Sequence, residues 1–354
     1  MKHKKTIISL ILIILILIIS SVIIFIHELS PVDKKNENIV LFTVENGWGK
    51  NKIIKELKNK DLIRNEFFSK LIIKLKNKEL YAGTYKLSKD LSTNEIIKLL
   101  EDATNVENES IKITFVEGKR LKTYIKQISE NFDYSEEEIT NKLSDKEYLD
   151  KLISKYWFIT EDIYNEKIYY PLEGYLYPDT YEFKQNSTLE EIIEKMLNNM
   201  DSKLSNYKDE IKLSNYNIHE LLTLASIVEL EGVNSKDRSM VAGVFYNRLK
   251  SNMTLGSDVT TYYAVDKDFT RNLSQKDLDS CNGYNTRGTC VTGLPVGPIC
   301  SSSLSSLAAS IEPTENEYFY FVADKEKNTY FSKTSTEHTQ TVAKLKSEGK
   351  WYTY

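Results

Sequence analysis

The chain has 354 residues, in which 47 Lys and Arg stand against 51 Asp and Glu, for a formal net charge of −4. This acidic balance disfavours a nucleic-acid-binding protein, which usually carries an excess or a stripe of positive charge. The length is sufficient for two domains that each bury a hydrophobic core.

The N-terminus combines a short basic segment with a long apolar one. Residues 6–26 contain no charged side chain, and three lysines precede them. As a helix this segment would span roughly 31 Å, against a hydrocarbon core of about 30 Å. The lysines favour a cytoplasmic N-terminus, so we predict residues 1–5 inside the cell, a transmembrane helix over 6–26 and an extracytoplasmic body after a stalk at 27–38. A cleaved signal peptide is the alternative, but no small-residue cleavage site follows the apolar run.

The next segment has the pattern of a small α+β module. Strand composition at 39–44 and 82–87 encloses two segments of helical periodicity, 52–58 and 66–76. A third helix is expected over 92–100, because it opens with the Ser and Glu of a capping box.

Polar residues at 102–109 predict a linker to a second, larger unit. This unit begins with a strand at 111–116 and a helix from Leu121, and lysine-rich helical sequence continues to about Glu161. The segment 171–181 is dense in aromatic residues and bounded by prolines. Such rings either stack on sugar faces or fill a core.

An apolar helix is then predicted to end on a carboxylate. Asn217 and Glu220 have the spacing of a capping box, apolar residues recur at helical spacing as far as Val228, and Gly232 is placed to end the helix in a left-handed cap. Glu229 lies at the edge of the apolar stripe. A carboxylic acid beside apolar surface keeps its proton closer to neutral pH, which suits a general acid. The alternative is a solvated residue at the helix boundary.

The C-terminal third is less regular. A helix from Ser235 is followed by turn-rich sequence over 256–299, and long irregular loops of this kind are usually functional. One helix, two strands and a final helix are then expected at residues 305–310, 318–323, 329–332 and 336–346.

Three cysteines fall in or directly after the turn-rich segment. An extracytoplasmic location permits a disulfide, either Cys281–Cys290 or Cys290–Cys300, and reduced thiols are the alternative. Because the spacing contains no CxxC unit, we predict no zinc site and no catalytic role for the thiols.

Short motifs follow one another in a fixed order across residues 40–346. They are Ala82 to Tyr85, Val116 to Gly118, Glu173 to Thr180, Ala225 to Glu229, Val241 to Leu249, Tyr284 to Thr286, Gly293 to Pro295 with Gly297 to Ile299, and Tyr320 to Ala323. Because it carries these motifs in this order and at this spacing, the chain resembles the YceG-like (MltG) endolytic murein transglycosylases. Two positions depart from the family pattern: Gly256 stands where a Gln is common, and Val296 where a second Pro is common.

The resemblance implies a fold and an activity. The expected fold class is α+β, with an N-terminal transmembrane helix, a small LysM-like module at residues 39–104 and a larger YceG-like catalytic domain at 110–354. The family cleaves nascent peptidoglycan strands internally on the outer side of the cytoplasmic membrane, and its essential Glu falls on Glu229. No sugar-binding role is carried over to Gly256. We predict no cofactor and no metal.

The implied reaction uses a single carboxylate. Glu231 is two positions beyond Glu229, so the two side chains point to different faces of the helix. The resemblance implies that Glu229 protonates the oxygen between N-acetylmuramic acid and N-acetylglucosamine, then takes a proton from the C6 hydroxyl to leave a 1,6-anhydro end. The cut would terminate strand elongation.

Other polar groups are candidates for binding saccharide, with local loop and cap hydrogen bonding as the alternative role. These substrate-binding candidates are Asn247, Arg248, Asp258, Thr260, Tyr284 and Asn285. The expected partners are peptidoglycan glycan strands, the cytoplasmic membrane and peptidoglycan synthases. Two other functions remain open: a membrane-anchored peptidoglycan hydrolase in which Asp258 places a water, and a non-enzymatic glycan-binding scaffold.

Overall fold

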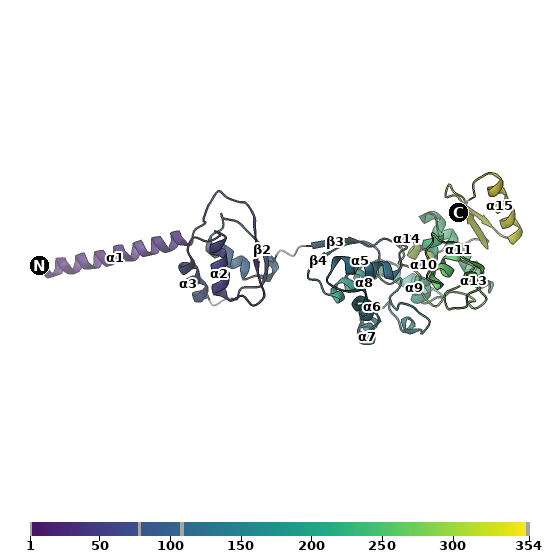
Figure 1. Ribbon diagram of the computed structural model, residues 1–354, viewed down its shortest axis with the longest axis horizontal. Coiled ribbons are helices and arrows are strands. Elements are labelled where there is room, and N and C mark those ends of the chain that lie inside the picture. The colour runs from purple at the N-terminus through teal and green to yellow at the C-terminus, as the bar shows by residue number, and fades with distance from the viewer. Residues whose placement is uncertain (1, 77–78, 107–109, 352–354) are drawn as a thin grey trace. The chain divides into compact units, whose positions relative to one another are not determined.

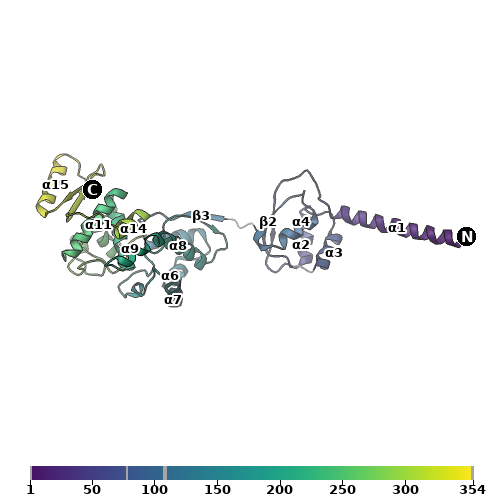
Figure 2. The same cartoon turned by 180° about the vertical axis from the view of Figure 1, so that it is seen from behind.

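The computed structural model describes residues 2–76, 79–106 and 110–351 (Figure 1; Figure 2 gives the opposite view). The chain divides into two compact units, Met1–Glu109 and Ser110–Tyr354. The predicted residues 107–109 of the linker lie outside the described residues.

The first unit begins with a long helix, α1 (Lys2–Glu28), which is largely exposed from Ile11 onward. Its segment Ile11–Glu28 has a mean hydropathy of 2.8, and by length and composition it can cross a membrane. The predicted helix over 6–26 lies within α1. The orientation of α1 in the membrane, with the N-terminus in the cytoplasm, stays a prediction.

A two-stranded sheet and three helices form the rest of this unit. They are β1 (Val40–Val44), α2 (Lys50–Asn59), α3 (Glu66–Lys76), β2 (Gly83–Leu87) and α4 (Thr93–Leu100), followed by the short 3-10 turn η1 (Ala103–Asn105). β1 pairs antiparallel with β2, and alternate side chains such as Phe42 and Tyr85 are buried against the helices. The predicted capping box is present, because Ser92 Oγ accepts from the Glu95 amide at 3.3 Å.

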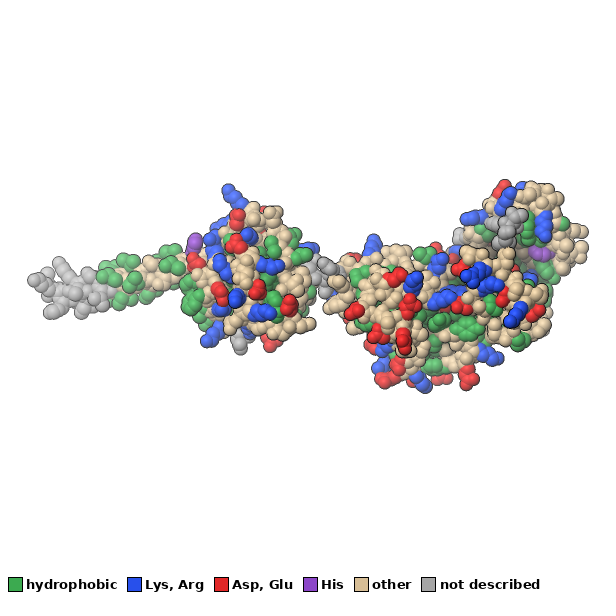
Figure 3. Space-filling view, viewed as in Figure 1, with side chains coloured by type: hydrophobic (Ala, Val, Ile, Leu, Met, Phe, Trp, Pro, Cys, Tyr) green, Lys and Arg blue, Asp and Glu red, His purple; other side chains and the backbone are tan. Residues whose placement is uncertain are grey.

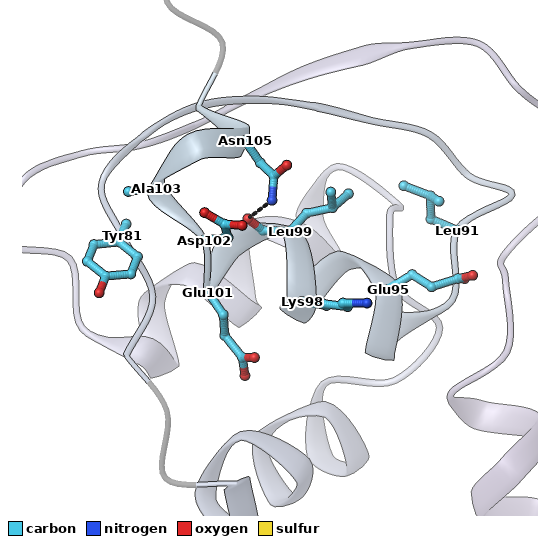
Figure 4. A pocket seen from close by; sticks show the side chains of 9 residues that line it. All are labelled: Tyr81, Leu91, Glu95, Lys98, Leu99, Glu101, Asp102, Ala103 and Asn105. Atoms are coloured by element: carbon cyan, nitrogen blue, oxygen red, sulfur yellow. Dashed lines mark hydrogen bonds between the residues drawn. The ribbon is translucent and has the colours of Figure 1, made fainter.

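A hollow of about 890 Å³ lies beside α4 and η1 (Figure 4). The ring of Tyr81 stands at one side of it, and Glu101, Asp102 and Asn105 line it with polar groups. Asn105 is held in place by a hydrogen bond from its Nδ2 to Leu99 O at 3.3 Å.

The second unit is mainly helical, with two antiparallel strand pairs, β3–β4 and β5–β6, in its described part. Its elements are β3 (Ser110–Thr114), α5 (Leu121–Asn131), α6 (Glu136–Ser144), α7 (Lys146–Lys155), η2 (Glu161–Tyr164), β4 (Thr180–Lys184), α8 (Leu189–Leu204), η3 (Ser205–Tyr207), α9 (Lys208–Leu213), α10 (Ile218–Glu231), α11 (Ser235–Lys250), α12 (Asp258–Ala264), α13 (Gln275–Leu278), α14 (Leu304–Ile311), β5 (Tyr320–Ala323), β6 (Thr329–Ser332) and α15 (Ser335–Ser347).

Two hydrophobic cores share helix α10. Leu221, Leu222 and Ala225 belong to the core built around β3, β4 and α5–α8. Leu224 and Val228 belong to the core formed with α11, α12 and the C-terminal hairpin. The expected one-sided stripe is therefore wrong, because every residue from 218 to 229 except Glu220 is buried, so apolar side chains pack on more than one face of the helix.

The aromatic segment 171–181 fills the first of these cores. Tyr175 is fully buried, and Tyr177 and Tyr181 are at most 7% exposed. Tyr175 also hydrogen-bonds to His219 of α10 across 2.7 Å. The sequence left open whether these rings stack on sugars or fill a core; in the structure they fill a core.

The turn-rich segment contains two short helices, α12 and α13, and a disulfide between Cys281 and Cys290. Cys300 is a buried thiol that donates to Ser226 O at 3.3 Å, and burial raises its pKa. Of the two pairings considered, the bridge is therefore Cys281–Cys290.

Reducing this disulfide should lower the stability of the second unit. The bond closes a loop with a sequence separation of 9, and constraining a loop of this size in the unfolded chain contributes roughly 2–3 kcal/mol. We expect dithiothreitol to lower the urea midpoint of the purified protein, and to leave a variant with both Cys281→Ser and Cys290→Ser unchanged. Equal sensitivity of the two proteins would contradict this.

Candidate active site

Glu229 stands on the last turn of α10. The predicted capping box at the start of this helix is confirmed, because Asn217 Oδ1 accepts from the Glu220 amide at 3.0 Å. The helix ends at Gly232 with φ −80° and ψ 121°, so the expected left-handed cap is wrong. Glycine is needed there for another reason: a Cβ would lie 2.4 Å from Cγ of Arg238. The close approach of Arg238 to the helix end depends on that missing side chain.

The carboxylate of Glu229 is enclosed by hydrogen-bond donors. Its Oε1 accepts from Arg238 Nη2 at 2.7 Å. Its Oε2 accepts from the amide and hydroxyl of Ser303 at 2.8 and 2.6 Å, and from the hydroxyl of Ser306 at 2.7 Å. Glu229 is only 7% exposed. Among the described residues it thus has one cationic partner on one oxygen and a cluster of neutral donors on the other.

These partners come from two neighbouring helices. Arg238 lies in the first turns of α11, and its Nη1 donates to the hydroxyls of Ser303, at 3.0 Å, and Ser305, at 2.5 Å. Ser303 is the N-cap of α14. The Glu229 carboxylate therefore sits at the N-terminus of α14, where the helix dipole and free amides favour an anion.

The surroundings of Glu229 differ from those expected. Ile227 and Val228, its apolar sequence neighbours, are fully buried and point into the second core. The carboxylate itself faces a guanidinium and serine hydroxyls. The prediction of an apolar environment for the Glu229 carboxyl group is therefore wrong.

A tight turn lies next to Glu229. Gly118 has φ +70°, and a Cβ there would be 3.8 Å from Cγ of Glu229. Its amide donates to Ser301 O at 2.8 Å, and the Ser301 amide donates back to Lys119 O at 3.0 Å. The backbone of the Val116 to Gly118 motif thus lies next to Glu229. Backbone hydrogen bonds join this turn to Ser301, in the segment that also contains Ser303.

A second carboxylate, Glu173, joins the segments that surround the site. It is 1% exposed, its Oε1 accepts from the Leu121 amide at 2.8 Å and its Oε2 from the Tyr263 hydroxyl at 3.0 Å. Burial raises the pKa of Glu173 to about 7, against the lowering effect of these two hydrogen bonds. The next residue, Gly174, has φ +79° and leaves no room for a Cβ, which would lie 2.4 Å from Pro298.

Two of the substrate-binding candidates connect α11 to the C-terminal hairpin. Asn247 Nδ2 donates to the carbonyls of Asn316 and Tyr318, both at 2.9 Å. Arg248 donates through Nε to Phe319 O and through Nη1 to Leu255 O, both at 2.6 Å. Burial lowers the pKa of Arg248.

The other candidates lie in the turn-rich segment. Thr260, Tyr284 and Asn285 are fully buried, and Asn285 Nδ2 holds the loop by donating to Leu278 O at 2.9 Å. Asp258 is exposed and pairs with Arg287 at 3.2 Å. All six candidates thus have contacts within the protein, and none is among the described partners of Glu229; their role in binding sugar stays a prediction.

Glu231 faces a different part of the unit, as expected from its position. Its Oε1 accepts from Ser257 Oγ at 2.6 Å, and burial raises its pKa. Sequence reasoning missed Arg238, Ser303 and Ser306, the partners of Glu229. The serine-rich run from residue 301 to 306 was the available signal.

Comparisons with known proteins identify the family. The model of the YceG-like family matches residues 42–344. The chain belongs to the YceG-like family. An endolytic murein transglycosylase of Bacillus subtilis strain 168 is 35% identical over 315 residues, covering 88% of this chain and 86% of that protein.

Two further similarities extend this result. An endolytic murein transglycosylase of Streptococcus pneumoniae strain D39 is 31% identical to this chain. The match covers 90% of this chain and 60% of that protein. A crystal structure of a YceG-like protein from Listeria monocytogenes matches with a TM-score of 0.61 and 33% identity, covering 86% of this chain and 99% of that one. This chain and the Listeria monocytogenes protein therefore share a fold.

Removing the guanidinium beside Glu229 should cost stability, because the buried carboxyl group then loses its cationic partner. We expect Arg238→Met to lower the free energy of unfolding by roughly 3–5 kcal/mol, because an uncompensated buried carboxylate remains. In a Glu229→Gln background the same substitution should cost clearly less. Urea unfolding of the four proteins measures this coupling, and an equal loss in both backgrounds would show that the pair is not coupled.

Glu173 should make stability depend on pH. Its carboxyl has an unperturbed pKa of 4.5, so between about pH 4.5 and 7 it ionises in the unfolded chain while the folded protein keeps the proton. The wild type should therefore lose stability with rising pH relative to Glu173→Gln, by on the order of 1–3 kcal/mol. Unfolding of both proteins at pH 5 and pH 8 tests this, and a difference that does not change with pH would refute it.

Proposed function

We propose that this chain is a membrane-anchored endolytic lytic transglycosylase of peptidoglycan, with Glu229 as its acid and base. The observation that carries this is a buried carboxylate held by Arg238 and the N-terminus of α14, in a chain whose relatives are named endolytic murein transglycosylases. The bond cleaved joins N-acetylmuramic acid to N-acetylglucosamine.

The two oxygens of Glu229 are suited to different tasks. Oε2 accepts from both groups of Ser303 and from Ser306, which fixes the carboxylate. Oε1 accepts from Arg238 alone among the described residues, so it has a lone pair free for substrate. Oε1 is therefore the atom that exchanges the proton.

The reaction follows from that assignment. Protonated Oε1 gives its proton to the glycosidic oxygen as the bond from that oxygen to C1 breaks. The C6 hydroxyl then attacks C1, and its proton returns to Oε1, leaving a 1,6-anhydro end with no water consumed. Arg238 stabilises the carboxylate that exists between the two transfers.

A single active carboxylate favours transglycosylation over hydrolysis, which commonly uses two. Glu231 is engaged with Ser257, and Asp258 is paired with Arg287 at the surface. Their contacts are separate from those of Glu229. The hydrolase remains the second candidate.

We further assign the finer organisation. Residues 1–5 are cytoplasmic and the catalytic domain is extracytoplasmic, which the three lysines at the start of α1 support. Residues 39–104 act as a LysM-like, glycan-binding module, supported by the order β1–α2–α3–β2 and by the hollow that Tyr81 lines. Tethering near emerging strands lets the enzyme end their elongation beside peptidoglycan synthases.

Glu229→Gln should abolish cleavage while the fold persists, because the amide has the same size but cannot transfer a proton. Loss of general acid and base catalysis costs on the order of 10²-fold or more. Mass spectrometry of fragments released from purified sacculi measures both rate and product. The matched control is Glu231→Gln, which should stay close to wild type.

The products distinguish the two enzymatic candidates. Fragments with 1,6-anhydro-muramic acid ends are expected. Reducing muramic acid ends would establish a hydrolase, and equal losses in the two variants would indicate a carboxylate pair.

A further inference from the structure

Helix α3 has two apolar faces, of which only one is used in packing. Ser69, Ile72 and Ile73 are buried in the first unit. On the other side, Phe67 and Leu75 are 71% and 73% exposed, and Leu71 between them is 38% exposed. Residues spaced four apart form one stripe along a helix. Single exposed apolar residues are ordinary, but a continuous stripe marks an interaction surface.

The stripe is continuous with the membrane anchor. Phe68 adjoins Phe67, with ring centroids 5.4 Å apart, and its ring meets that of Phe25 in α1 edge-on at 5.5 Å. An apolar hollow of about 480 Å³ between α1 and Phe68 extends from Ile14 to Phe25. Phe25 lies three residues before the end of α1, or about 4.5 Å along its axis. If α1 crosses a bilayer, α3 thus lies at the level of its surface.

Contacts after α1 hold the rest of the unit to the anchor. Leu29 is 6% exposed, and its carbonyl accepts from the Thr93 amide at 3.0 Å. Arg64, two residues before α3, donates to Pro31 O at 2.8 Å and to Val32 O at 2.9 Å. The segment predicted as a stalk is therefore packed against the unit where it leaves α1, so α3 cannot swing freely away from the anchor.

Basic side chains accompany the stripe. Lys70 and Lys74 lie on α3 beside Phe67 and Leu71, around a hollow of about 810 Å³ that Lys50 also lines. Lys70 is paired with Glu66. Figure 3 shows basic and apolar side chains side by side on the surface of this unit. Apolar residues flanked by lysines are the pattern of a helix that lies in a membrane interface, where the amines reach anionic headgroups.

We propose that α3 is a second membrane contact: Phe67, Leu71 and Leu75 insert into the leaflet surface beside α1, and the flanking lysines contact anionic lipid headgroups. This rests on the proposed role of α1 as a membrane anchor. Two contacts would fix the orientation of the first unit on the bilayer, which a single helix cannot do.

Depth-dependent quenching tests the proposal in the full chain. Selective labelling is possible because Cys281 and Cys290 are bridged and Cys300 is buried. Three variants, Phe67→Cys, Leu41→Cys and Ile16→Cys, receive an environment-sensitive fluorophore and are reconstituted in vesicles of phosphatidylglycerol and phosphatidylcholine. Leu41 is the matched control, being 51% exposed on β1.

We expect a lipid-bound quencher to act on the Phe67 label about threefold or more strongly than on the Leu41 label, as for a residue buried in the interface. Adding Lys70→Glu and Lys74→Glu should weaken that quenching, as should vesicles of phosphatidylcholine alone. The Ile16 label should be quenched in every case.

The outcomes separate the two proposals. A quenched Ile16 label with a Phe67 label open to aqueous quencher would overturn the inference and leave the anchor standing. A Phe67 label shielded from both quenchers would assign the stripe to a second protein molecule, which also overturns it. An Ile16 label that lipid does not quench would refute the anchor itself.

Discussion

The carboxyl group of Glu229 meets a guanidinium and a helix N-terminus at one point, and the arrangement of the second unit depends on this meeting. A buried anion needs compensation from charge and hydrogen bonds together. Arg238 supplies the charge from α11, and Ser303 and Ser306 supply neutral donors from α14. The three helices must therefore meet at their ends, and Gly232 allows this because it has no side chain in the path of Arg238.

A second carboxylate joins the segments around that point. Glu173 connects the start of α5 to α12, and Gly174 packs directly on Pro298. The Gly118 turn and Ser301 exchange backbone hydrogen bonds close to Glu229. Glycine is thus needed at both places, for the left-handed backbone of Gly118 and for the close packing of Gly174 on Pro298.

Local patterns were predictable from the sequence. The capping box of α10 and the bounds of α3 and β6 agree with the structure. Helix α8 has no counterpart among the predicted elements, although Thr188 and Glu191 have the spacing of a capping box, which is a signal for a helix start. Helix α12 is only seven residues long, too short for periodicity to show against the surrounding turns.

The site was predictable only in part. Glu229 followed from its motif, whereas Ser303 lies 74 positions away and Arg238 on another helix. Tertiary packing decides which distant side chains contact a carboxylate. The spacing of residues along the chain does not reveal these contacts. The same limit applies to the setting of Glu229: apolar sequence neighbours indicated an apolar environment, but on a helix buried all round they point elsewhere.

Because α10 belongs to two cores at once, Glu229 stands on one of the least mobile parts of the molecule. Opening this helix would expose both cores, so its amides should exchange with solvent only through global unfolding. Any adjustment to a bound glycan must then come from the elements around it, such as the start of α11. Glu229, the proposed acid and base, would then serve as a fixed reference for such adjustments.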